Sequence, residues 1–198
     1  MAMTDEEYML RAVELAKKGT GWTNPNPLVG AVIVKDGRII GEGYHKKYGE
    51  LHAEREALAS ANEDVSGATI YVTLEPCCHY GKQPPCVNAI IEAGIKRVVI
   101  GSYDPNPLVA GKGVDILREH NITVDDKLVC SEECKSLNYV FFNYIKEKKP
   151  YVILKYAQSL DGKIATHTGL SQWITGETAR NKVHMDRHRY SAVMVGVE

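Results

Sequence analysis

Residues 69–102 read TIYVTLEPCCHYGKQPPCVNAIIEAGIKRVVIGS, and this stretch decides the fold. β-Branched and aliphatic side chains dominate 69–74 and 97–102, which we therefore predict to be strands. Between them, 86–93 has the composition of a helix, and a loop rich in cysteine and proline, 76–86, precedes it. Strands that alternate with helices are typical of an α/β sheet covered by helices on both faces, which is the fold class we predict.

The segments on either side of this unit extend the same pattern. Thr4 and Glu7 have the spacing of a capping box, so we predict that a helix begins there and covers 6–18. The turn Lys35-Asp36-Gly37 separates two apolar segments and predicts a β-hairpin. The remaining predicted elements are strands 29–34, 38–44 and 122–124, and helices 52–61, 114–120 and 131–146.

The chain is predicted to contain one domain and part of another. Lys146 to Pro150 is charged, poor in apolar residues and closed by proline, which is typical of a domain boundary. We therefore divide the chain into residues 1–146 and 147–198. The second part begins with a predicted strand at 151–154 and ends within another at 192–198. A segment of this size cannot build an α/β core by itself, so we expect a truncated domain.

Composition narrows the classes of protein that remain. Of 198 residues, 44% are hydrophobic and 25% are charged, which excludes a disordered chain. The formal net charge of −1 argues against a nucleic-acid-wrapping protein, and no apolar run approaches the ~18 residues of a membrane span. The five cysteines are odd in number, and the N-terminus lacks the features of a signal peptide, so we expect a reducing, cytoplasmic location.

A metal site is predicted from one histidine and two cysteines. His52, Cys77 and Cys86 offer one imidazole and two thiolates, a set that suits Zn²⁺ and leaves a fourth tetrahedral position for water. Glu54 follows His52 by two residues, so both can reach one ion only where a helix begins. Zinc-dependent base deaminases combine His-x-Glu with Pro-Cys, and their glutamate moves protons instead of binding the metal.

The choice of Cys77 and Cys86 as ligands has alternatives. Eight residues separate Cys77 from Cys86, more than the Pro-Cys-x-x-Cys spacing usual in these deaminases, and Cys78 lies inside that loop. We choose Cys77 because it follows proline and Cys86 because it begins a helix, although Cys77 and Cys78 could also form a buried apolar pair. Cys130 and Cys134 have no histidine or cysteine partners nearby, so we expect them to pack in the core.

Six segments together give a specific resemblance to a known family. Four lie in 1–146, namely Asn24–Gly30, His52–Glu54, Pro76–Cys86 and Asp104–Gly113, and two lie beyond Tyr151, namely Lys155–Lys163 and Ser171–Thr175. Throughout 1–146 the chain resembles the bifunctional deaminase–reductase of bacterial riboflavin biosynthesis, and its segment from Tyr151 resembles the opening of that family's reductase domain.

The resemblance implies a cytidine-deaminase-like three-layer domain with a central mixed sheet, followed by the opening segment of a dihydrofolate-reductase-like domain. The implied activity is zinc-dependent hydrolytic deamination of 2,5-diamino-6-ribosylamino-4(3H)-pyrimidinone 5′-phosphate, with an incomplete NADPH-dependent reductase. The implied metal ligands are His52, Cys77 and Cys86, with Glu54 as the proton shuttle. The implied binding residues are Asn26, His45, His79, Lys82, Ser171 and Arg187 for substrate, and Ala157 and Trp173 for the nucleotide.

Two other functions stay open at this point. One is a deaminase of transfer-RNA adenosine or of a free nucleotide, although the long loop between the two cysteines and the reductase-like segment count against it. The other is a zinc-stabilised interaction module without catalysis, against which Glu54 argues. We expect a phosphorylated pyrimidine as the partner, neither nucleic acid nor membrane, and the sequence leaves assembly with further copies of the chain open.

Overall fold

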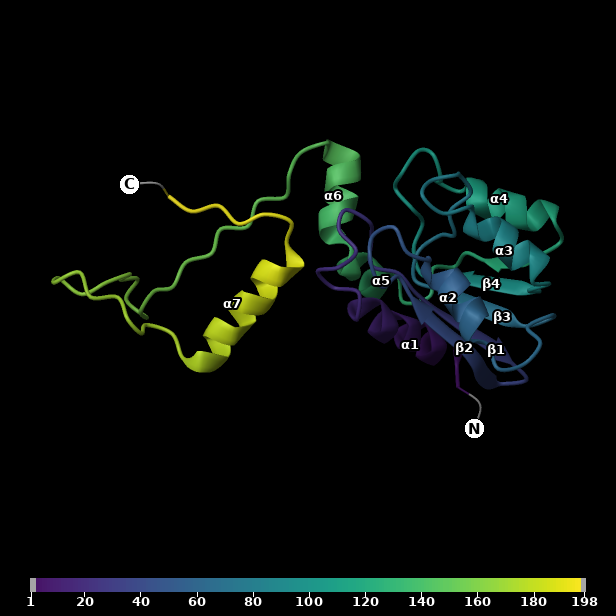
Figure 1. Cartoon of the computed structure of the whole chain (residues 1–198), viewed down its shortest axis with the longest axis horizontal. Helices are drawn as coiled ribbons and strands as arrows, with labels where there is room; N and C mark the ends of the chain where they lie inside the picture. The colour runs from purple at the N-terminus through teal and green to yellow at the C-terminus, as the bar shows by residue number, and fades with distance from the viewer. Residues whose placement is uncertain (1–2, 197–198) are drawn as a thin grey trace.

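The computed structural model describes residues 3–196 and contains one mixed five-stranded sheet (Figure 1). The strand order is β2-β1-β3-β4-β5. β1 is antiparallel to both of its neighbours, whereas β3, β4 and β5 are parallel, so the expected mixed sheet is confirmed. The strands are β1 (Gly30–Lys35), β2 (Arg38–Tyr44), β3 (Thr69–Val72), β4 (Arg97–Ile100) and β5 (Thr123–Asp125).

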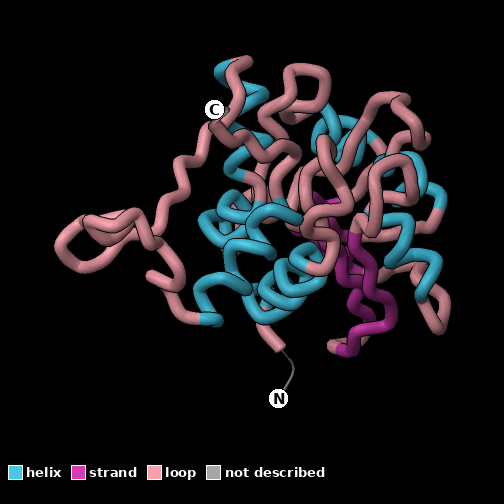
Figure 2. Tube along the Cα trace, turned by 60° about the vertical axis from the view of Figure 1, so that its left-hand side comes forward, coloured by secondary structure: helices cyan, strands magenta, loops and turns pink. Residues whose placement is uncertain are grey.

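Helices cover both faces of this sheet, as Figures 1 and 2 show. Side chains alternate along each strand, so Val32 and Tyr71 pack on one face while Ile33 and Ile70 pack on the other. The first face is covered by α1 (Asp5–Lys17) and α5 (Ser131–Leu137), and the second by α2 (Ala53–Ser60), α3 (Cys86–Glu92) and α4 (Lys112–Glu119). The expected three-layer α/β arrangement is therefore confirmed.

The local signals at the N-terminal end form as predicted. Thr4 Oγ1 accepts a hydrogen bond from the Glu7 backbone, and the Glu7 carboxylate accepts one from the Thr4 N–H, which completes the capping box. Asp36 and Gly37 both have positive φ, at 50° and 71°. Such a turn matches the twist of the two strands that it joins, and this explains the tight hairpin between β1 and β2.

The predicted helix 131–146 is in fact two helices, so that prediction is wrong in its continuity. α5 ends at Leu137, and α6 covers Tyr139–Glu147. Asn138, between them, is 5% exposed and has a non-helical backbone. Its side-chain oxygen accepts from the Leu28 N–H and its amide donates to the Leu28 carbonyl, each at 2.7 Å. This paired contact explains the break.

The C-terminal segment differs most from expectation. The strands predicted at 151–154 and 192–198 do not form in the described part of the chain, and residues 197–198 lie outside it. No neighbouring strand among residues 3–196 pairs with either segment. Instead, α7 (Glu177–Arg189) forms without a buried residue, beside the sheet layers and not within them (Figure 1). None of the helices within residues 3–196 combines the length and apolar character that crossing a membrane requires.

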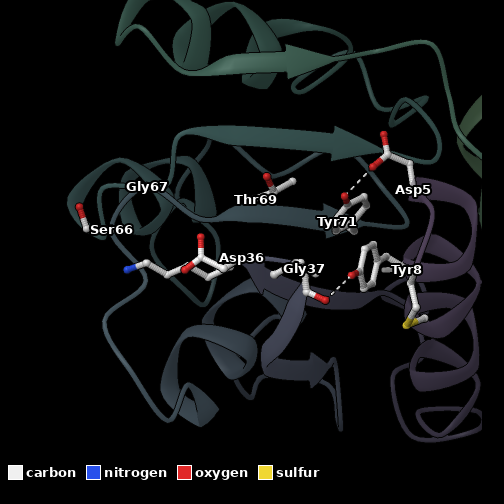
Figure 3. A pocket seen from close by; sticks show the side chains of 11 residues that line it. Asp5, Tyr8, Asp36, Gly37, Ser66, Gly67, Thr69 and Tyr71 are labelled. Atoms are coloured by element: carbon white, nitrogen blue, oxygen red, sulfur yellow. Dashed lines mark hydrogen bonds between the residues drawn. The ribbon is translucent and has the colours of Figure 1, made fainter. Parts of the chain in front are cut away.

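A polar cluster ties α1 to the sheet at the end remote from the predicted metal loop. Arg97 of β4 forms ion pairs with Asp5 at 2.5 Å and with Asp125 at 3.1 Å. The Tyr71 hydroxyl also donates to Asp5 at 2.6 Å, as Figure 3 shows. The Arg97 guanidinium lowers the pKa of Asp5 by hydrogen bonding to it. Beside this cluster is a cavity of about 360 Å³, and none of the predicted site residues lines it.

We expect Arg97→Met to destabilise the fold by about 1–2 kcal/mol at pH 7, because two half-buried carboxylates lose their cation. A carboxyl whose folded pKa lies below its unfolded value stabilises the fold above the unfolded pKa, and this is lost as the pH falls through the folded value. The difference between variant and wild type should therefore shrink below about pH 4. Urea unfolding at pH 7 and pH 3 measures this difference in the free energy of unfolding. Lys17→Met, which removes an exposed pair, is the control, and an equal loss in both variants would contradict the prediction.

Candidate metal centre and substrate pocket

Two helix starts meet at the end of the sheet where β3 leads into the cysteine-rich loop. His52 is at the N-cap position of α2 and has an extended backbone, and its side chain makes no capping hydrogen bond. Cys86 is the first residue of α3 and directly follows Pro85. Proline suits this position because it has no N–H for a helix start to leave unsatisfied. The predicted convergence of two helix N-termini is therefore confirmed by the structure.

The candidate ligand atoms lie at zinc-binding distances from one another. His52 Nδ1 is 3.5 Å from Cys77 Sγ and 3.4 Å from Cys86 Sγ. Tetrahedral zinc, with bonds of ~2.0–2.1 Å to nitrogen and ~2.3 Å to sulfur, would hold these atoms about 3.5 Å apart. All three atoms lie within 4.8 Å of one another, and residues 3–196 contain no second group of this kind. The donor set and its spacing therefore fit zinc with one position left open.

Local hydrogen bonds favour the thiolate form at Cys77. The Cys86 thiol lowers the pKa of Cys77, and the His52 ring adds to the effect. The Cys86 backbone N–H also donates to Cys77 Sγ at 3.4 Å, so the first turn of α3 faces the sulfur. In return, Cys77 raises the pKa of His52. A helix N-terminus stabilises negative charge, which suits a sulfur that must lose its proton to bind a metal.

Glu54 lies beside the three ligands without joining them. It sits in the first turn of α2 and is 3% exposed. Burial, and next the negative charge of Cys77, raises the pKa of Glu54 to about 7. A carboxyl with this pKa can both accept and release a proton near neutral pH. Glu54 is not part of the group of three candidate ligands.

A cavity of about 180 Å³ opens directly over this centre. Three of the four predicted substrate residues of the first domain line it, namely Asn26, His79 and Lys82, together with the ligands His52 and Cys77. His79 Nδ1 is buried without a hydrogen-bond partner in the described chain. Lys82 Nζ lies 4.0 Å from the centre of the ring of Tyr48, which also lines the cavity. Besides Tyr48, the remaining lining residues are Gly49, Glu50, Gly81 and Gln83.

His45, the fourth of these residues, lies behind the cavity and not on its wall. Its ring is 2% exposed, and burial lowers its pKa. Nδ1 lies 3.0 Å from the Leu51 carbonyl, which can only accept, so we assign the ring proton to Nδ1. Nε2 of the neutral ring is then free to accept from the Asn26 amide at 3.2 Å. The structure thus places His45 as a support for Asn26.

The residues predicted for the second domain lie away from this cavity. Ala157, Ser171 and Trp173 belong to a segment without regular structure, and Arg187 is on α7. The guanidinium of Arg180 lies 4.3 Å from the Trp173 ring centre. None of the four predicted residues lines the cavity, and their cofactor and substrate roles remain predictions.

Two acidic residues near the metal loop, Glu75 and Asp104, are not among the site residues predicted from the sequence. Glu75 is 3% exposed and immediately precedes Pro76. Asp104 lies in the second of two similar Pro-Asn-Pro loops, and burial raises its pKa to about 6. The repeated loop sequence was a signal for Asp104. Nothing local marks Glu75, since its partners lie more than twenty residues away along the chain.

The other cysteines behave as the sequence suggested. Cys78 Sγ donates to the Leu108 carbonyl at 3.6 Å, so it takes no part in the group of ligand atoms. Cys134 is fully buried against α1 and the sheet, with Cys130 packed against the same cluster. Burial raises the pKa of both of these thiols, which therefore favour the protonated form.

Comparison with known proteins agrees with this geometry. Residues 2–102 match the family described as cytidine and deoxycytidylate deaminase zinc-binding region. The chain belongs to this family. Residues 150–198 match a second family, described as RibD C-terminal domain. The two matches fall on either side of the predicted boundary, and the first contains all three predicted zinc ligands together with Glu54.

Several relatives of this deaminase-family chain are named riboflavin biosynthesis protein RibD. It is 61% identical over 196 residues to the riboflavin biosynthesis protein RibD of Actinobacillus pleuropneumoniae, covering 99% of this chain and 52% of the relative. Identity to RibD of Escherichia coli is 50%, covering 97% and 52%. The crystal structure of a diaminohydroxyphosphoribosylaminopyrimidine deaminase/5-amino-6-(5-phosphoribosylamino)uracil reductase from Thermotoga maritima superposes with a TM-score of 0.89 at 57% identity, covering 94% of this chain and 54% of that one. The chain thus spans about half the length of these relatives.

We expect Cys86→Ala to abolish stoichiometric zinc binding, because the metal would keep only two protein ligands. Zinc per chain, measured by atomic absorption after dialysis against a weak chelator, should fall from about one to less than ~0.1. Cys78→Ala is the matched control, since its sulfur points at Leu108, and should stay near one. Equal zinc content in both variants would show that the ligand assignment is wrong.

Proposed function

We propose that residues 1–146 form a zinc-dependent deaminase domain that hydrolyses the 2-amino group of 2,5-diamino-6-ribosylamino-4(3H)-pyrimidinone 5′-phosphate. The observation that carries this proposal is the buried Glu54 beside three zinc-binding atoms, of which those of His52 and Cys77 belong to residues that line a cavity. The names of the relatives supply the substrate. We further propose that residues 147–198 begin a reductase domain.

The chemistry requires water to replace ammonia on a ring carbon. A bound zinc ion would lower the pKa of a water molecule to ~7 and so supply a nucleophile at neutral pH. Glu54 would take a proton from the attacking water and give it to the ring nitrogen beside the amino-bearing carbon, while the water oxygen bonds to that carbon. Glu54 would then take the proton of the added hydroxyl group and pass it to the amine. The carbon–nitrogen bond breaks and a carbonyl oxygen remains on the ring, so that one water is consumed and one ammonia released. Burial keeps the proton exchanged by Glu54 away from bulk solvent.

The cavity also provides contacts for the rest of the substrate. At about 180 Å³ it suits a pyrimidine ring, so the ribosyl phosphate would extend toward its opening. Asn26, held from behind by His45, offers its side-chain oxygen to a ring donor. The unpaired His79 Nδ1 and the Lys82 ammonium are the polar groups that we assign to the phosphate side.

For the second segment we propose a role only in a longer reductase. Ala157 and Trp173 would contact NADPH, and Ser171 and Arg187 the substrate. Within residues 3–196 the segment 148–176 has no helix or strand. We expect the chain of 198 residues to oxidise no NADPH in the presence of the deaminated product. Measurable oxidation, followed by absorbance, would contradict this.

Glu54→Gln should retain zinc but lose at least ~10² of the rate, because the amide cannot exchange protons. Ammonia release from the diaminopyrimidinone ribosyl phosphate, with zinc content measured on the same samples, tests this. Glu56→Gln on the same helix is the control, because Glu56 pairs with Lys46 at the surface. A Glu54 variant with most of its activity would exclude the proposed role, and zinc-loaded wild-type protein without ammonia release would favour a non-catalytic zinc module.

Lys82→Met should raise KM for the phosphorylated substrate about tenfold or more, since one charge-assisted contact to phosphate is lost. The KM for the dephosphorylated nucleoside should change little. Lys96→Met removes an exposed lysine at the start of β4 and serves as the charge control. Steady-state ammonia assays with both substrates make the comparison. An equal rise in KM for both would place Lys82 away from the phosphate.

A further inference from the structure

Glu75 joins the end of a strand to the metal loop. It follows β3, and its backbone N–H donates to the Ser102 carbonyl at 2.9 Å, so the parallel pairing continues beyond the strands. The side chain is 3% exposed, in a place where water cannot solvate a carboxylate. Such a group must find hydrogen-bond donors within the protein. Those donors lie on a segment distant in sequence.

The carboxylate is held by backbone N–H groups of residues 104–113. Gly111 N donates to both oxygens, at 2.9 and 3.0 Å, and Gly113 N donates to Oε1 at 3.1 Å. Asp104 N lies 3.4 Å from Oε2. Gly111 is the residue before α4 and has no side chain with which to cap it. Glu75 therefore supplies in trans the acceptor that the start of α4 lacks.

A close approach of the two backbones strengthens this connection. A Cβ at Gly113 would lie 2.4 Å from the Pro76 carbonyl oxygen, so only glycine lets α4 come this near to the metal loop. Pro76 is followed directly by the ligand Cys77. The first turn of α4 thus rests on the chain one residue before a metal ligand, and Glu75 fixes it there.

The loop held by Glu75 is linked to the metal loop through Leu108 and Cys78. Within the loop, Asp104 Oδ1 accepts from Asn106 N at 2.8 Å and Asn106 Oδ1 accepts from Leu108 N at 3.1 Å. The Leu108 carbonyl in turn accepts from Cys78 Sγ. Cys78 is adjacent to His79, whose unpaired Nδ1 is buried at the cavity. Cys77 and Cys86 instead contact each other at the start of α3.

We propose that Glu75 is a positioning residue of the deaminase: its carboxylate clamps residues 104–113 against the metal loop and thereby fixes His79 for substrate binding. This inference rests on the proposed function for its kinetic part. The clamped loop contacts Cys78, the neighbour of His79, through the Leu108 carbonyl. The Cys77 sulfur is also held by the first turn of α3, which the clamp does not include. We therefore expect substrate affinity to depend on the clamp and zinc binding to be retained.

Glu75→Gln tests the clamp because glutamine has the same shape but turns an N–H group toward backbone donors. In the zinc-loaded chain we expect KM for the diaminopyrimidinone ribosyl phosphate to rise at least ~10-fold, with kcat changed less than ~3-fold and zinc still about one per chain. Hydrogen exchange should quicken at the amides of Asp104, Gly111 and Gly113. Asp115→Asn is the matched control, since it removes a charge from the first turn of α4 at an exposed position.

Gly113→Ala is the second variant, and it keeps Glu75 intact while forcing α4 away from Pro76. It should raise KM in the same way, and combining it with Glu75→Gln should add little, because both changes release one clamp. If Glu75→Gln does not fold, Gly113→Ala decides the question alone.

An unchanged KM in either folded variant, or unchanged exchange at the three amides in Glu75→Gln, would overturn the proposal. A merely structural role would lower stability and leave KM as it is. If wild-type protein releases no ammonia from this substrate, the proposed function fails. In that case hydrogen exchange at the amides of Asp104, Gly111 and Gly113 still tests whether Glu75 holds residues 104–113.

Discussion

The structure depends on bringing one imidazole nitrogen and two sulfurs to within bonding distance of a single ion. These atoms belong to residues that are 9 to 34 positions apart in the sequence. The parallel pairing of β3 with β4 sets where the metal loop begins, and α2 and α3 start at the same end of the sheet. Because both helices begin at the site, His52 and Glu54 reach the same centre although they are only two residues apart.

Buried negative charge at this end of the domain is balanced chiefly by backbone groups. The first turn of α3 donates to Cys77, and the start of α4 donates to Glu75. Backbone N–H groups at helix starts are fixed in place, so they stabilise an anion without the cost of ordering a long cationic side chain. Glu54 has the least compensation of these groups, and its pKa is raised accordingly. One site therefore contains both a thiol whose pKa is lowered and a carboxyl whose pKa is raised to about 7.

The second segment illustrates why a strand-forming sequence need not form a strand. Val152, Leu154, Val193 and Val195 are all exposed, and no strand within residues 3–196 offers them backbone partners. The segment contacts the first domain through α7, where His188 packs edge-on to Trp22 and the Arg189 carbonyl accepts from Asn24. It also does so through Tyr151, whose ring packs edge-on to that of Tyr139. Asn24 is two residues from Asn26, which lines the cavity.

The α/β class, the capping box at Thr4 and the hairpin turn could be predicted from the sequence, because each follows from a local pattern of residues. The candidate metal ligands are up to 34 residues apart, but they belong to short motifs, His-x-Glu and Pro-Cys, that can each be recognised locally. Three other features appear only in the folded structure: His45 supports Asn26, Asn138 divides a helix, and Glu75 contacts the start of α4. The separations in sequence are 19, 110 and 36 residues. A hydrogen bond of this kind forms only after packing has excluded water from both partners. The residues next to each partner in the sequence therefore do not predict it.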